Sequence, residues 1–110
     1  MITTHILDTS LGRPAAGVPV TLEHSTNGGW HRVGSGATDA DGRLKTLTAT
    51  GALATGVYRI RFDTGAYFAA TGTAAFFPVV EIQFEVADGG AHYHVPLLLS
   101  PFGYSTYRGS

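Results

Sequence analysis

Apolar and β-branched residues occur along the chain in short runs that are separated by turn residues. The runs are rich in Val, Ile, Thr, Tyr and Phe, and almost none repeats with the 3.6-residue period of an amphipathic helix. The pattern favours a short helix only at residues 64–71, in the sequence TGAYFAAT. The remaining runs predict strands at residues 2–8, 17–24, 29–37, 43–47, 56–63, 78–87, 91–99 and 103–108.

Turn signals between these runs define the organisation of the chain. Asn27-Gly28 and Asp88-Gly89 offer the positive φ values that tight turns require. Residues 1–110 contain no repeat, no linker and no low-complexity segment, so we expect one domain. About eight short strands at regular spacing predict an all-β fold, a two-sheet antiparallel β-sandwich with one short helix.

Composition and charge narrow the class of protein. Apolar residues make up 44% of the chain and charged residues 14%, which is enough to bury a core and argues against disorder. The net charge of −1 favours neither nucleic acid nor an anionic membrane as a partner. The start MITTHILD does not read as a signal peptide, and no apolar window reaches the roughly 18 residues of a membrane span. We therefore expect a cytoplasmic protein.

Strand alternation places the candidate chemical groups on particular faces. His5 and Asp8 fall on opposite faces of the first predicted strand, and Asp8 is expected to serve a turn. His92 and His94 share a face of the strand over 91–99, with His92 nearer the preceding turn and therefore expected at the periphery. Arg43 opens a strand directly after a turn.

Three interpretations of these side chains remain open. Isolated histidines are commonly structural or solvated. A His-x-His pair on a strand points two imidazoles the same way and can bind zinc or copper, but it needs a third ligand from elsewhere. Imidazole can also carry a proton near neutral pH, and a guanidinium such as that of Arg43 can hold a developing oxyanion. The residue types alone do not choose among these interpretations.

Two stretches narrow the choice, because they resemble the two signatures of the transthyretin-related family. They are HILDTSLGRPAAGVPV at 5–20 and YHVPLLLSPFGYSTYRGS at 93–110. Between them TDADGRL (38–44), GVYRIRFDT (56–64) and FFPVVEIQFEV (76–86) fall in the expected order. The resemblance covers essentially the whole chain and agrees with the predicted sandwich.

Within that family, the sequence YRGS at 107–110 and histidine at positions 5 and 94 are similar to the enzyme branch. The resemblance implies hydrolysis of the six-membered ring of 5-hydroxyisourate, a cyclic amide, to 2-oxo-4-hydroxy-4-carboxy-5-ureidoimidazoline in urate degradation. It implies no cofactor and no metal. The alternative is a non-enzymatic carrier that binds a small aromatic ligand in a central channel, as the hormone-carrier branch does.

The resemblance also implies the residues of the site. His94 is expected to act as general base with His5 positioning, Arg43 to hold the carbonyl oxygen, and Ser110 to orient the water or a histidine. The substrate-binding residues expected from the family pattern are His5, Arg43, Tyr107, Arg108 and Gly109. The implied assembly is a homotetramer, a dimer of dimers, with the sites and the chain end in the channel between the dimers.

Overall fold

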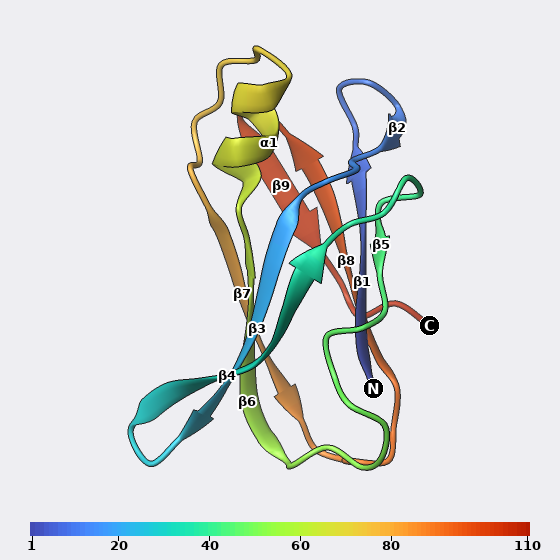
Figure 1. The fold of residues 1–110 in the computed structure, drawn as a ribbon, viewed down its shortest axis with the longest axis vertical. Helices are drawn as coiled ribbons and strands as arrows, with labels where there is room; N and C mark the ends of the chain where they lie inside the picture. The colour runs from blue at the N-terminus through green and yellow to red at the C-terminus, as the bar shows by residue number, and fades with distance from the viewer.

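Two β-sheets face each other in the computed structural model, which describes residues 1–110 (Figure 1). One sheet contains β1 (Ile2–Asp8), β2 (Arg13–Pro14), β5 (Arg43–Leu44), β8 (Tyr93–Ser100) and β9 (Gly103–Thr106). The other contains β3 (Pro19–Thr26), β4 (Gly29–Ala37), β6 (Gly56–Phe62) and β7 (Val80–Val86). The helix α1 (Thr64–Ala70) follows β6 and lies at one end of the sandwich.

The predicted sandwich and its short helix are confirmed, with one correction to the pairing. Strands β1 and β8 run parallel over their whole length, so the first sheet is mixed and not purely antiparallel. Parallel neighbours need a long connection, and here most of the chain lies between the two strands. Strand β2 was not expected, and β5 ends at Leu44 instead of continuing to residue 47. Strand β3 spans 19–26 instead of 17–24, and β6, β7, β8, β9 and α1 differ from the predicted bounds by one or two residues at an end.

The core lies between the sheets and is formed by the residues that face inward, which alternate along each strand with residues that face outward. Strand β1 shows the alternation clearly, because Thr4, Ile6 and Asp8 are buried while His5 and Leu7 are partly exposed on the outer face. The largest fully enclosed side chains are Ile2, Ile6, Val18, Val20, Leu22, Leu47, Ile60, Phe62, Val80, Val86, Leu97 and Leu99. The only helix, α1, is neither long nor apolar enough to cross a membrane.

The hairpin between β3 and β4 forms as its sequence predicts. Asn27 and Gly28 have φ values of 49° and 77°, and Thr26 pairs with Gly29 across a two-residue loop. Positive φ at both central positions is the geometry of a type I′ turn, whose twist matches that of the flanking strands. The Asn-Gly pair therefore fixes the register of this hairpin.

Asp8 closes the end of β1 through its side chain, as expected from the sequence. Its Oδ1 accepts hydrogen bonds from the backbone N–H and hydroxyl of Ser10, at 3.0 and 2.6 Å, and its Oδ2 accepts one from the Tyr67 hydroxyl at 2.7 Å. Burial and the adjacent Asp8 carboxylate raise the pKa of Tyr67 to about 12. These bonds fasten α1 to the end of β1. They engage both carboxylate oxygens of Asp8, so Asp8 does not pair with a histidine.

Candidate active site

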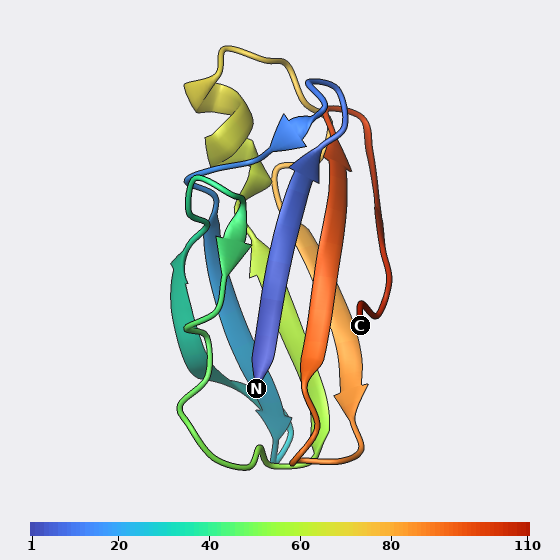
Figure 2. The ribbon, with the colours of Figure 1, turned by 90° about the vertical axis from the view of Figure 1, so that its right-hand side faces the viewer.

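In Figure 2 the sheet that contains β1 faces the viewer, with β1 between β5 and β8. The ladders of this sheet bring together the chemical groups expected from the sequence. In the parallel ladder Thr3 pairs with His94, and in the antiparallel ladder between β1 and β5 His5 pairs with Arg43. Cross-strand partners project from the same face of a sheet. Because β1 lies between β5 and β8, residues from three distant parts of the chain meet on one surface.

The His94 ring is held on two sides. Its Nδ1 lies 2.8 Å from the Thr3 hydroxyl, and a Cβ added to Gly109 would lie 2.6 Å from its Cδ2. The backbone at Gly109 therefore covers one edge of the ring, while Thr3 occupies the Nδ1 position. The ring nitrogen that remains for a substrate or a water molecule is Nε2.

The surroundings of His94 favour the neutral imidazole. Burial is the main reason that the pKa of His94 lies below its ordinary value of 6.5. Coulombic interactions with His92, Arg43 and His5 act in the same direction. A neutral imidazole at physiological pH can accept a proton, which is what a general base must do.

Arg43 is positioned by a tight turn. The Asp39 carboxylate accepts hydrogen bonds from the backbone N–H groups of Arg43 and Asp41, each at 2.9 Å. Gly42 has a φ of 74°, and a Cβ there would lie 2.5 Å from the Ile6 carbonyl oxygen. Glycine therefore lets this turn approach β1 closely. Arg43 forms no ion pair, since both salt bridges of the chain involve Arg59, and its guanidinium remains available for a substrate.

The segment 107–110 returns along β8. The Gly109 N–H donates to the His94 carbonyl at 2.8 Å, in the same register as the β8–β9 ladder. The Arg108 guanidinium lies 4.4 Å from the centre of the Tyr93 ring, a cation–π contact, and donates to the His92 carbonyl at 3.5 Å. The segment is thereby tied to the strand that carries His94.

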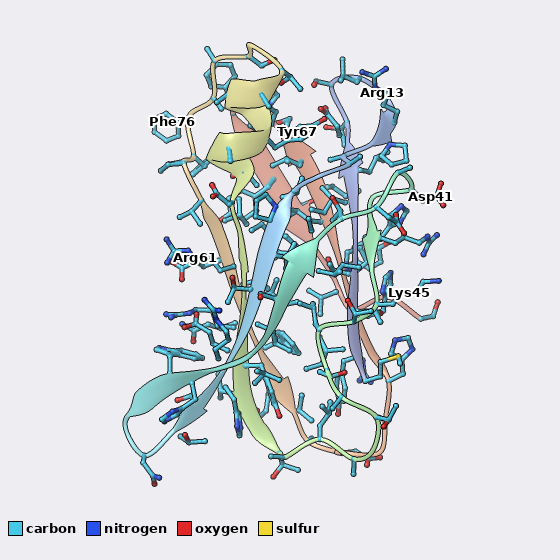
Figure 3. The ribbon with its side chains drawn as sticks, viewed as in Figure 1. Arg13, Asp41, Lys45, Arg61, Tyr67 and Phe76 are labelled. Carbon is cyan, nitrogen blue, oxygen red and sulfur yellow. The ribbon has the colours of Figure 1, made fainter.

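These groups surround a pocket of about 260 Å³ on the outer face of the sheet. Figure 3 shows Lys45 next to β5, on the side of the molecule where the chain ends. The pocket contains cationic side chains and imidazoles but no Asp or Glu side chain, so it suits a polar substrate whose oxygen atoms carry or develop negative charge. The residues that line it are Met1, Thr3, Thr4, Arg43, Lys45, His92, His94 and Ser110.

The predicted site residues divide into three groups. Arg43, His94 and Ser110 line this pocket, and His5 lies beside it as the register partner of Arg43. Gly109 contacts the His94 ring. The other two predicted residues, Tyr107 and Arg108, instead line a second cavity of about 250 Å³ between β7 and β8.

Five lining residues were not predicted from the sequence: Met1, Thr3, Thr4, Lys45 and His92. His92 was expected at the periphery, but its Nε2 lies 2.9 Å from the Thr3 hydroxyl inside the group. The shared strand face of His92 and His94 was the signal that could have included it. Thr3 had no comparable signal, because threonine is an ordinary strand residue until its partner strand is known.

A metal site has no support from the arrangement of the side chains. No group of three or more His, Cys, Asp or Glu residues is placed so that it could hold a metal ion. The Nδ1 of His94 and the Nε2 of His92 both face the Thr3 hydroxyl and are engaged in hydrogen bonds. The geometry instead fits acid–base chemistry by an imidazole beside a guanidinium.

Comparisons with known proteins agree with the fold. The model of the HIUase/Transthyretin family matches residues 2–109. The 5-hydroxyisourate hydrolase of Salmonella dublin is 48% identical over 110 residues, which span 100% of this chain and 81% of that protein. The structure of Klebsiella pneumoniae 5-hydroxyisourate hydrolase superposes with a TM-score of 0.87 at 40% identity, covering 99% of this chain and 98% of that one. Sea bream transthyretin in complex with thyroxine superposes with a TM-score of 0.92 at 38% identity, covering 98% of this chain and 93% of that one.

Proposed function

The chain belongs to the HIUase/Transthyretin family, and we propose that it is a hydrolase that opens the six-membered ring of 5-hydroxyisourate. The observation that carries the proposal is the pocket in which His94, Arg43 and Ser110 meet. These groups supply a base, a cation and a hydroxyl around one small space. Relatives named as 5-hydroxyisourate hydrolases match over the whole chain.

The chemistry follows from the position of each group. The Nε2 of neutral His94 takes a proton from a water molecule as the water oxygen attacks the ring carbonyl. The Arg43 guanidinium pairs with the carbonyl oxygen as negative charge grows on it, and Ser110 orients the water. The proton held by His94 then passes to the ring nitrogen as the C–N bond breaks. His5 orients the substrate beside Arg43, its partner in the β1–β5 ladder.

The alternative, a carrier for a small aromatic ligand, is weaker. The fold does not separate the two functions, because a hydrolase and a transthyretin with bound thyroxine both superpose closely on this chain. The pocket does separate them. Its lining contains one hydrophobic residue among eight, and an apolar ring would leave the imidazole and guanidinium groups without polar partners.

Turnover tests the proposed function against the carrier. Substoichiometric protein should convert all of a freshly prepared sample of hydroxyisourate and speed the decay of its ultraviolet absorbance. A carrier would bind at most one equivalent per site and leave the remaining decay unchanged. Loss of absorbance limited to the protein concentration would therefore favour the carrier.

The pH dependence of the reaction should report the pKa of His94. Because the pKa of His94 is lowered, its imidazole stays neutral at pH values just below 6.5 and becomes protonated only when the pH falls through the lowered pKa. We expect the acid limb of kcat/KM to have its midpoint below 6.5, since this parameter reports groups of the free enzyme. Initial rates measured across the acid range test this. A midpoint above 6.5 would contradict a buried neutral imidazole as the base.

The proposed assembly is a homotetramer, a dimer of dimers with the sites between the dimers. The support from this chain is that β7 and β9 are unpaired sheet edges and that Tyr107 is 58% exposed. Unpaired edges present backbone groups that a second copy can pair with. Light scattering should give four times the 11.5 kDa mass of one chain, and a monomer at assay concentrations would exclude the shared channel.

The location in the cytoplasm stays a prediction. Fractionation of the source cells, followed by immunodetection of this chain in each fraction, would test it. Detection only outside the cytoplasmic fraction would contradict it.

A further inference from the structure

A single buried hydroxyl connects two histidines in the pocket. The Oγ1 of Thr3 lies 2.8 Å from the Nδ1 of His94 and 2.9 Å from the Nε2 of His92. Thr3 is 5% exposed, so water competes little for these bonds. The centroids of the two imidazole rings lie 6.4 Å apart, and the Thr3 oxygen links the rings.

The number of protons on the hydroxyl restricts the arrangement. A hydroxyl group can donate one hydrogen bond and accept two, whereas each nitrogen of a neutral imidazole is either a donor or an acceptor. If Thr3 donates to His94, the Nδ1 of His94 carries no proton and its Nε2 must carry one. That tautomer has no free electron pair facing the pocket. If Thr3 donates to His92, the Nδ1 of His94 carries the proton and its Nε2 is free.

We propose that Thr3 is a positioning residue that holds His94 in the tautomer with Nδ1 protonated, and that His92 is the acceptor that makes this possible. The hydrogen bonds then run from the Nδ1–H of His94 to Thr3 and from the Thr3 hydroxyl to the Nε2 of His92. The inference rests on the proposed function, because it explains why His94 and not His92 is the base. The ring nitrogen of His92 nearest the site is occupied by the Thr3 proton.

The same hydrogen bonds stabilise the imidazolium of His94 that forms during the reaction. When the Nε2 of His94 takes a proton from water, one N–H bond forms and one O–H bond breaks. The Nδ1–H of the charged ring continues to donate to Thr3, so no group has to turn. The Thr3 oxygen, polarised by the electron pair of His92, is then the nearest acceptor for that charge. The charged side chains of the pocket, Arg43 and Lys45, are both positive, so no acidic side chain there takes the place of this acceptor.

Histidine nitrogen NMR tests the tautomer without any substrate. Protein labelled with ¹⁵N at histidine is measured near neutral pH, with the His94 signals identified by their loss in His94→Ala. We expect the Nδ1 of His94 to be protonated and its Nε2 to be bare in the wild type. In Thr3→Val, which keeps the branched shape and removes the hydroxyl, the population should move toward the Nε2-protonated form. In Thr3→Ser the hydroxyl remains, and the tautomer should be that of the wild type.

Kinetics of the same variants test the consequence. Thr3→Val should lower kcat by about 10- to 100-fold with a smaller change in KM, which is part of the roughly 10²- to 10⁴-fold contribution of a positioned general base, because many molecules then hold His94 in the tautomer that cannot accept a proton at Nε2. Thr3→Ser should recover most of that loss. Three outcomes would overturn the inference: wild-type His94 protonated at Nε2, full kcat in Thr3→Val, or Thr3→Ser as slow as Thr3→Val. If Thr3→Val does not fold, the tautomer of His94 in the wild-type protein and the tautomer and kcat of Thr3→Ser still test the inference.

The two measurements separate this inference from the proposed function. A protein that shows the expected tautomer but does not accelerate the decay of hydroxyisourate contradicts the proposed function. A protein that hydrolyses hydroxyisourate with His94 in the other tautomer contradicts only the role of Thr3.

Discussion

Replacing His94 by alanine is expected to lower kcat for hydroxyisourate hydrolysis by roughly 10²- to 10⁴-fold, the contribution of a positioned general base. The ring lies on the outer face of β8, half-buried, and its removal leaves the β1–β8 ladder intact. The variant should therefore fold. The rate of absorbance loss of freshly made hydroxyisourate measures the effect, and circular dichroism with a thermal melt checks the fold.

His31→Ala is the matched control for this substitution. His31 lies on β4 in the other sheet, and its side chain is exposed and forms no hydrogen bond. Its replacement should leave kcat unchanged. Near-wild-type activity of His94→Ala would remove His94 from the role of base and transfer it to His5, the other histidine beside Arg43.

Gly109→Ala is expected to disrupt the site although it adds a single methyl group. The new Cβ would lie 2.6 Å from the Cδ2 of His94 and 3.2 Å from the Cγ of Pro96, so either the ring or the chain end has to move. A moved ring loses the Thr3 contact, and a moved chain end withdraws Ser110 from the pocket. A displacement of about 1 Å in a catalytic group can cost roughly 100-fold in rate, and we expect a loss of kcat of that order.

Gly103→Ala separates this effect from a general intolerance of the β8–β9 hairpin. A Cβ at Gly103 would meet only the Ser100 hydroxyl oxygen at 3.7 Å, an ordinary contact. Gly103→Ala should keep wild-type kcat, and both variants should melt as the wild type does to within a few degrees. Full activity of Gly109→Ala would show that segment 107–110 does not hold the catalytic ring.

The sequence predicts which face each residue occupies, but not which strands are neighbours. Alternation in β1 correctly separates Asp8, which serves a turn, from His5 on the outer face. The parallel pairing of β1 with β8 depends on packing between segments far apart in the chain, which local periodicity does not describe. The two-residue strand β2 is too short for any alternation to be visible.

The limits of the site prediction have the same cause. Thr3 becomes part of the site only because the β1–β8 register places it opposite His94. His92 joins the group because its ring reaches the same hydroxyl. The family pattern supplied the importance of segment 107–110, which no periodicity indicates. It did not supply the separation that the structure shows between Ser110 in the pocket and Tyr107 in a neighbouring cavity.

That separation is consistent with a site completed by assembly. Tyr107 is largely exposed in a single chain and lies beside the free edge of β7. In the proposed tetramer such a side chain would meet a second copy or face the channel between dimers. Its expected role in substrate binding stays a prediction.

The most direct test is the initial rate of hydroxyisourate loss at increasing concentrations of the wild-type protein in H₂¹⁸O, with the product analysed by mass spectrometry. Hydrolysis in the His94–Arg43–Ser110 pocket predicts a rate proportional to protein concentration and a ring-opened product that carries one oxygen from the solvent. A rate that stays at the value without protein, whatever concentration is added, would contradict it.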